Sequence, residues 1–289
     1  PAVPPDRREG AVPFRKRDGT KRSRSGTRRN VRLRRECGPR GWPAFRLPAW
    51  SLHLADAMPV SLPTESPGGA PAALAVEGET CWRRLQATRA QVLVDAARYF
   101  RWFVHTARQA RQTLYIAGWD LHPDLALLRQ SDGDEPSLAA LLDELVRRRP
   151  ALQVHVLLWD FSTLYVMERA SLASLEAHKF SRRTHERVRF ALDSAHPLGA
   201  CQHQKLVVAD DQVAYSGGID LGRGRWDTRA HAAEDGRRRD PGGRPYPPFH
   251  DVQLAVQGPP AQALGDLFRE RWRLAVGDQL SPPEARERS

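Results

Sequence analysis

Residues 203–220 read HQKLVVADDQVAYSGGID, and this stretch decides how the rest of the chain is interpreted. Side chains alternate between the two faces of a strand, so His203 and Lys205 are predicted on one face, with Leu206 and Val208 in the packing layer. An imidazole can attack phosphorus, and an ammonium two residues away can hold a phosphoryl oxygen as negative charge develops on it. The pair therefore suits phosphodiester chemistry.

Asp210 follows His203 by seven residues. Because residues an odd number apart in a strand point to opposite faces, Asp210 is not expected on the face that carries His203 and Lys205. It falls in a turn at residues 210–212, before a second strand predicted over residues 213–216. We interpret Asp210 as a positioning residue first and a chemical residue second.

Lysine usage supports the assignment of Lys205. The chain has 45 Lys and Arg residues, and only four of them are lysines. A cation placed by background usage would almost always be arginine, and the two differ where a compact point charge must reach a phosphate. We therefore interpret Lys205 as a residue with a functional role rather than one placed by background composition.

The pattern His-x-Lys-x4-Asp, followed by Gly217 and Gly218, resembles the signature of the phospholipase D superfamily. The sequence downstream adds to the likeness, with Gly-Ile-Asp-Leu at 218–221, Arg-Trp-Asp at 225–227, His-Asp at 250–251 and Gly-Pro at 258–259. Upstream, Cys-Trp-Arg at 81–83 and Gly-Trp-Asp at 118–120 also match. The resemblance covers about residues 78–276, which corresponds to one lobe of the family.

The resemblance implies a shared active site. In that family the motif occurs twice, one histidine attacks phosphorus to form a phosphohistidine, and the other protonates the leaving alcohol. This sequence holds a single copy, so we expect a second lobe, either by dimerisation or from a missing C-terminal half. The implied catalytic residues are His203 as nucleophile, Lys205 and Asp210, and the implied substrate-binding residues are Gly217, Gly218, Asp220, His250 and Asp251.

A metal-dependent alternative would use His203, Asp210, His250 and Asp251 as ligands. Lys205 within that group would repel a divalent cation, and the sequence has no His-x3-His or Cys-x2-Cys spacing. We therefore predict neither a metal nor another cofactor, and a reaction that survives a chelator.

Apolar periodicity predicts the order of the elements. Helices are expected over 81–111, 136–148, 161–180 and 261–274, and strands over 112–120, 152–160, 187–191, 203–210, 213–216 and 250–257. Alternation of strands with helices predicts an α/β fold with a mixed, mostly parallel sheet covered by helices on both faces. Ligands of such sheets bind beyond the carboxyl ends of strands.

Several residues near those strand ends have structural interpretations. Asp120 and Asp160 each follow a strand and are interpreted as caps of the following turns. Trp119 and Trp159 are expected in the core. Cys201 precedes the motif by two residues and is expected to be a small buried residue rather than a catalytic thiol.

Charge separates the chain into a basic tail and a nearly neutral remainder. Residues 1–56 carry 15 Lys and Arg against 5 Asp and Glu, so the total of +11 leaves about +1 for residues 57–289. We expect residues 1–58 to be a disordered basic tail or a non-native extension that precedes Met58. A linker over 59–80, a catalytic lobe over 81–276 and a charged C-terminal tail over 277–289 complete the expected organisation.

Three functional classes follow from these observations. The first is a phospholipase D-like enzyme that acts on phospholipids by hydrolysis or phosphatidyl transfer, with peripheral membrane contact. The second is a dimeric single-motif nuclease, which the neutral charge of the lobe disfavours, although the arginines near Arg237–Arg239 offer a local polyanion site. The third is a non-catalytic half-lobe. The three scattered cysteines and the lack of a signal segment favour a cytoplasmic location.

Overall fold

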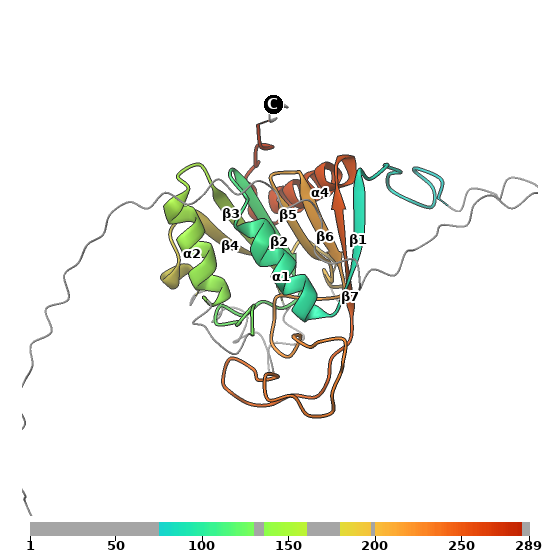
Figure 1. The fold of residues 1–289 in the computed structure, drawn as a ribbon. Helices are drawn as coiled ribbons and strands as arrows, with labels where there is room; N and C mark the ends of the chain where they lie inside the picture. Colours follow the sequence, from blue (N-terminus) through green and yellow to red (C-terminus); the bar gives the residue numbers. More distant parts are fainter. Residues whose placement is uncertain (1–74, 130–135, 161–179, 198–199, 285–289) are drawn as a thin grey trace, which may run out of the picture. The chain divides into compact units, whose positions relative to one another are not determined.

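The computed structural model describes residues 75–129, 136–160, 180–197 and 200–284 (Figure 1). The predicted N-terminal tail and most of the predicted linker lie outside these residues, as does nearly all of the helix predicted over 161–180. The last residues of the predicted charged tail, 285–289, lie outside as well.

The described elements follow one another along the chain as strands separated by helices and turns. Their bounds are β1 (Arg89–Val94), α1 (Ala96–Ala107), β2 (Thr113–Gly118), α2 (Leu138–Arg148), β3 (Gln153–Trp159), β4 (Val188–Asp193), β5 (Lys205–Ala209), β6 (Val213–Gly217), β7 (Val252–Gln257) and α4 (Pro259–Val276).

The seven strands form one sheet in the order β1-β7-β6-β5-β2-β3-β4. The pairs β2–β3 and β3–β4 are parallel, whereas β2–β5, β5–β6, β6–β7 and β1–β7 are antiparallel. The predicted α/β fold with a mixed sheet is confirmed. The expected predominance of parallel pairs is corrected, because a short turn joins β5 to β6 and such turns connect only antiparallel strands.

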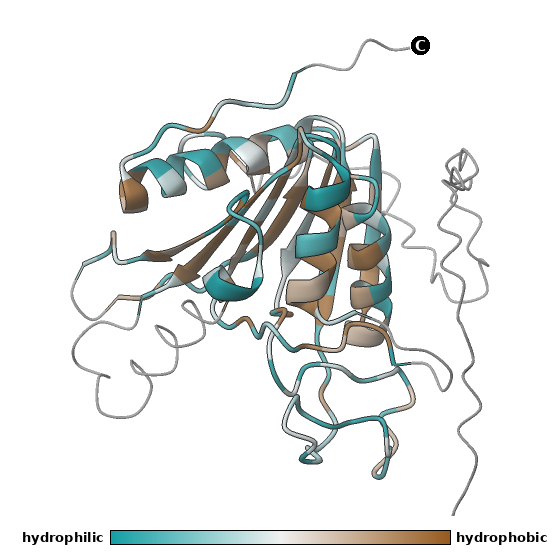
Figure 2. Cartoon of the chain, turned by 90° about the vertical axis from the view of Figure 1, so that its left-hand side faces the viewer, coloured by the Kyte–Doolittle hydropathy of each residue, from teal (hydrophilic) through white to brown (hydrophobic). Residues whose placement is uncertain are grey.

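Helices cover both faces of the sheet, as predicted (Figures 1 and 2). On one face, α1 and α2 pack on the strands through a core that includes Phe100, Leu142 and Val156. On the other face, α4 packs through Phe268 and Trp272. The central strands β2, β3 and β5 are therefore buried between two apolar layers, which fits their Val- and Leu-rich sequences.

The first helix was predicted to begin too early. The helix α1 begins at Ala96, and the residues before it form the edge strand β1. Its sequence RAQVLV has β-branched residues at Val92 and Val94, and β1 pairs antiparallel with β7 from Arg89 opposite Gln257 to Val94 opposite Val252. Because its partner strand is so distant in sequence, β1 gives no local signal, and the helical periodicity of α1 was extended over it.

The register brings the predicted site residues to one edge of the sheet. Lys205 at the start of β5 lies opposite Gly217 at the end of β6, and Gly217 lies opposite Gln253 near the start of β7. The end of β2 reaches the same edge, since Ala117 lies opposite Leu206. We call this end of the sheet, where β5 and β7 begin and β2 and β6 end, the reactive edge. It is distinct from the lateral edge strands β1 and β4. Among the described residues, no helix is long and apolar enough to cross a membrane.

Candidate active site

His203 lies at the reactive edge, just before β5 begins, and is exposed. Its ring meets the Trp119 ring edge-on, with centroids 4.8 Å apart and planes at 71°. Trp119 in turn stacks on Trp159 with a centroid distance of 4.1 Å. The pair of indoles forms an apolar wall beside an imidazole that solvent can reach, which suits a nucleophile that must meet a substrate from outside.

Lys205 is buried, with only 5% of its side chain exposed, and has a defined counter-ion. Its Nζ lies 3.1 Å from Oδ2 of Asp220 and donates to the backbone carbonyl of His203 at 3.2 Å. A buried ammonium is tolerated when paired, so Asp220 both stabilises Lys205 and fixes its position next to His203. Lys205 also lies over the Trp119 ring at 6.0 Å.

Asp220, predicted to bind substrate, is held in place by hydrogen bonds to the backbone. Its Oδ1 accepts hydrogen bonds from the backbone N–H groups of Trp119 (2.9 Å) and Asp120 (3.3 Å). The end of β2 is thereby tied to the residues after β6. Burial and the neighbouring Asp220 carboxylate raise the pKa of Asp120, and Arg225 works against that rise.

The two glycines after β6 permit a close approach of β7. A Cβ at Gly217 would lie 2.4 Å from the backbone oxygen of Val252, and one at Gly218 would lie 2.2 Å from the Asp251 carboxylate. Any larger residue would push the His250-Asp251 segment away from the reactive edge. The Asp251 carboxylate therefore lies next to Gly218, close to the motif.

Gln204, between the two motif residues, is held from the opposite face of the sheet. Arg271 of α4 donates to its Oε1 at 2.7 Å and forms an ion pair with the buried Asp193 at 2.7 Å. This chain of contacts anchors the segment that carries His203 to α4 and the end of β4. Sequence patterns did not indicate it, because its members are far apart in the chain.

Asp210 lies at the opposite end of β5, away from the reactive edge. Its carboxylate accepts three hydrogen bonds of 2.8 Å from the backbone N–H groups of Arg111, Gln112 and Thr113. These groups lie in the turn after α1 and at the first residue of β2, and buried N–H groups need acceptors. The placement favours the positioning role expected for Asp210 over a chemical one.

Two expectations about nearby residues need correction. Cys201 is exposed rather than buried, because the residues before Lys205 run ahead of the strand instead of within it. Trp119 was expected only in the core, yet it contacts His203. Trp159 is buried as predicted, and its Nε1 donates to Nε2 of His196 at 2.8 Å.

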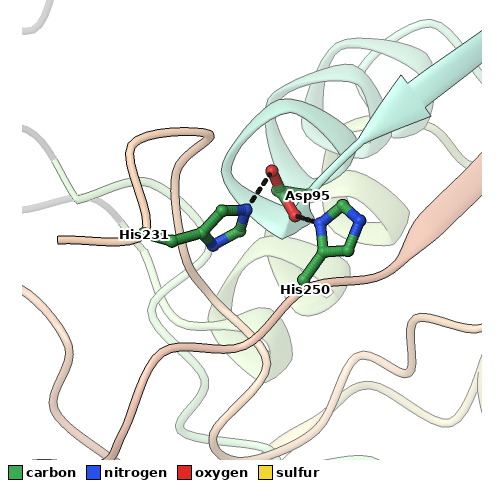
Figure 3. A group of neighbouring side chains, drawn as sticks. All are labelled: Asp95, His231 and His250. Carbon is green, nitrogen blue, oxygen red and sulfur yellow. Dashed lines mark hydrogen bonds and ion pairs between the residues drawn. The ribbon is translucent and has the colours of Figure 1, made fainter. Parts of the chain in front are cut away.

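His250 approaches a group of residues that the sequence did not single out. Its Nδ1 lies 2.8 Å from Oδ1 of Asp95, and Oδ2 of that carboxylate lies 3.2 Å from Nε2 of His231 (Figure 3). Asp95 follows β1, which was read as part of a helix, and this hid its place at the reactive edge. The one local sequence feature that indicates this group is the four-residue spacing between Asp227 and His231.

Comparison with known proteins places this architecture in a family. The family model for phospholipase D matches residues 106–284, which is more than half of the chain. The chain belongs to the phospholipase D family. The matched segment includes the His203–Asp210 motif, the two glycines and the His250-Asp251 pair, so the resemblance inferred from these residues is confirmed.

Individual phospholipase D relatives match with lower identity. Phospholipase D C of Dictyostelium discoideum is 26% identical over 209 residues, covering 63% of this chain and 12% of the relative. Phospholipase D zeta 1 of Arabidopsis thaliana is 27% identical over 220 residues, covering 65% and 19%. The chain thus spans less than a fifth of the length of either protein.

Among solved structures, the phospholipase D family member Nuc from Salmonella typhimurium superposes with a TM-score of 0.40 and 13% identity. That match covers 65% of this chain and 97% of Nuc.

Proposed function

We propose that this chain is a phosphodiesterase lobe that acts on phospholipids, by hydrolysis or by phosphatidyl transfer, through a covalent intermediate on His203. The observation that carries the proposal is the pairing of an exposed imidazole with a buried, counter-ion-held lysine at the reactive edge. A nucleophile that solvent can reach beside a fixed cation is the arrangement that displacement at phosphorus requires.

In this mechanism a ring nitrogen of His203 attacks phosphorus as the bond to the leaving alcohol breaks. Lys205 binds the non-bridging oxygens, on which negative charge grows in the transition state. The leaving alcohol takes a proton from a general acid, and water or a second alcohol then displaces His203 from phosphorus. Splitting one displacement into two lowers each barrier.

We infer that the general acid is the matching histidine of a second lobe. The sequence holds one His-x-Lys-x4-Asp motif, and the exposed His203 faces outward rather than into an enclosed pocket. A second lobe that covers the reactive edge, from another copy or from further chain, would supply the acid and exclude water from the intermediate.

A phospholipid is favoured over a nucleic acid by the surface next to the site. Val92, Val252 and Leu254 are 41–43% exposed on β1 and β7, and Val252 directly follows Asp251. Exposed apolar side chains beside a phosphate-directed site suit acyl chains and a membrane surface. We accordingly infer peripheral attachment to the cytoplasmic side of a membrane.

The arginine-rich loop gives little support to the nuclease alternative. Arg237 is paired with Asp235 at 2.6 Å, and Arg238 is buried against Asp227 at 3.2 Å. Arg239 donates to the backbone carbonyls of Gly236 and Gly243. These guanidinium groups stabilise the loop itself, whereas a nucleic-acid groove needs cations that are available to phosphates.

The test is a comparison of substrates under one condition. The purified chain is incubated with phosphatidylcholine vesicles, phosphatidylglycerol vesicles and single-stranded DNA, beside His203→Ala and the control His105→Gln on α1. We expect lipid turnover in the wild type and the control but not in His203→Ala, from an assembly that light scattering finds to be a dimer. Turnover of DNA alone would establish the nuclease, and no turnover by a folded monomer would establish the half-lobe.

A further inference from the structure

A second cluster at the reactive edge has the composition of a metal site. Asp95, His231 and His250 each offer a ligand atom, and these atoms all lie within 4.8 Å of one another (Figure 3). Asp95 follows β1 at the start of α1, whereas both histidines belong to the long loop between β6 and β7. The cluster thus joins two segments that are about 140 residues apart in sequence.

The Asp95 side chain does not serve the helix that it begins. Asp95 is the N-cap residue of α1, a position where aspartate normally accepts a hydrogen bond from the first turn, but its side chain makes no such bond. It is 1% exposed and turns toward the two imidazoles instead. Within the described part of the chain, its Oδ2 accepts no well-aligned hydrogen bond, although Nε2 of His231 is 3.2 Å away.

The spacing of the donors suits a small tetrahedral ion. Zinc bonds of about 2.0–2.1 Å to nitrogen and oxygen imply donor–donor distances of about 3.3 Å. The two imidazole nitrogens lie 2.8 Å and 3.2 Å from the two different oxygens of the Asp95 carboxylate, and all ligand atoms lie within 4.8 Å of one another, so modest side-chain shifts bring them to that spacing. Two imidazoles and one carboxylate favour zinc and its first-row neighbours, whereas calcium and magnesium require mainly oxygen ligands.

An outer carboxylate completes the pattern. Nδ1 of His231, the nitrogen that does not face Asp95, lies 3.3 Å from Oδ2 of Asp227. Metal-binding histidines commonly donate their second N–H to such a carboxylate, which fixes the tautomer and the ring orientation. Asp227 is fully buried and is itself held by the backbone N–H groups of Thr228 and Phe249. These bonds help to keep the pKa of Asp227 below its usual value.

The cluster is open to solvent on one side. The side chain of His250 is 63% exposed and that of His231 is 30% exposed, while Asp95 closes the inner side. An ion can therefore enter without unfolding, and water can occupy the fourth position.

We propose that Asp95, His231 and His250 bind one divalent transition metal, with zinc the preferred ion, and that this metal fastens the loop between β6 and β7 to the junction of β1 and α1. The role is structural: it sets the position of the His250-Asp251 segment at the reactive edge, and His250 acts as a ligand. The site does not depend on the phosphodiester chemistry of His203, so either proposal can fail without the other.

The test measures metal binding directly on the full chain. After chelator treatment and dialysis, the chain is titrated with Co²⁺, whose visible absorption reports a tetrahedral site, and with Zn²⁺ by calorimetry. The variants are Asp95→Asn, His231→Gln and His250→Gln, and His105→Gln on α1 is the matched histidine control. We expect one equivalent bound by the wild type and the control, and binding at least about 100-fold weaker in the three ligand variants.

A thermal scan supplies a second readout. Zinc should raise the melting temperature of the wild type and of His105→Gln, because an ion that binds only the folded state stabilises it, and should leave His250→Gln unchanged. His250 is largely exposed, so its substitution keeps the test decisive even where Asp95→Asn does not fold. Absence of the Co²⁺ absorption in the wild type, or an unchanged absorption in His250→Gln, would refute the site and leave a hydrogen-bonded cluster only.

Discussion

The two ends of β5 carry the same motif but serve different purposes. At its start, His203 is exposed beside Trp119, and the cation of Lys205 is held in place by Asp220. At its other end, both carboxylate oxygens of Asp210 accept hydrogen bonds from the backbone N–H groups of residues 111–113. Seven residues of extended chain separate the two ends by roughly 20 Å.

This difference shows that the motif combines chemistry with architecture. The strand between the two ends has fully buried side chains on both faces, so its position cannot vary. Asp210 fixes the far end of β5 to the start of β2, and the end of β2 carries Trp119 to His203. Substitutions at the two ends should therefore separate loss of activity from loss of stability.

The largest effect is expected at the exposed end. His203→Ala should lower turnover by at least about 10³-fold, because the nucleophile of the covalent step is lost. The melting temperature should stay within about 2 °C of the wild type, since an exposed side chain contributes little to stability. Initial rates and thermal scans on the same preparation would check both, and a large fall in melting temperature would contradict the separation.

At the anchoring end the order should reverse. Asp210→Ala removes the acceptor of three backbone N–H groups, and we expect a loss of about 3 kcal/mol in the free energy of unfolding. Asp210→Asn keeps one acceptor oxygen and should lose less. Urea titration measures both losses, while the rate per folded molecule should change less than about fivefold; a 10³-fold lower rate in a stable variant would make Asp210 a chemical residue.

Lys205→Arg tests whether the buried cation beside His203 must be a compact ammonium. The guanidinium is larger and planar, whereas the site encloses a compact ammonium against Asp220, so we expect a fall in kcat/KM of about 100-fold. The rate should fall mainly through kcat, because the contact with the phosphoryl oxygens strengthens in the transition state. A variant with wild-type kcat would show that any cation suffices at this position.

The smallest effect is expected at His155 on β3, which makes the free energy of unfolding depend on pH. Burial lowers its pKa to about 4, with the Arg189 charge acting in the same direction. Between about pH 6.5 and pH 4 the unfolded state therefore binds a proton that the folded state does not, and stability falls as the pH falls. From pH 7 to pH 5 the loss should be about 2 kcal/mol.

The matched variant for that prediction is His155→Phe, which keeps an aromatic ring against Tyr115 and Trp272. Its free energy of unfolding, measured by urea titration at pH 7 and pH 5, should lose most of the pH dependence that the wild type shows. An equal pH dependence in both proteins would assign the effect to another group.

Local patterns were sufficient for most of the fold. The periods of the described strands from β2 to β7 and of α2 and α4 appear in contiguous residues, and the motif placed His203 and Lys205 next to each other. The start of α1 was misread because β1 is an edge strand whose partner β7 is more than 150 residues away. The same long-range pairing supplies Asp95, which explains why the cluster around His250 was not found.

Ion pairs across the fold were also beyond sequence reasoning. Asp220 lies three residues beyond β6, and its 3.1 Å ion pair with Lys205 forms only once β5 and β6 are paired. Likewise, Arg271 reaches Gln204 from the opposite face of the sheet through α4. Pairs of this kind depend on which strands meet, and a spacing pattern within one strand does not contain that information.

In the proposed mechanism His203 forms a covalent bond to phosphorus. Its direct test is to mix the chain with phosphatidylcholine labelled in the phosphate, quench in alkali, where phosphohistidine survives, and locate the label by mass spectrometry. We expect label on the peptide that contains His203, absent from His203→Ala and retained in His105→Gln. Lipid turnover without any labelled histidine, or label on another residue, would contradict it.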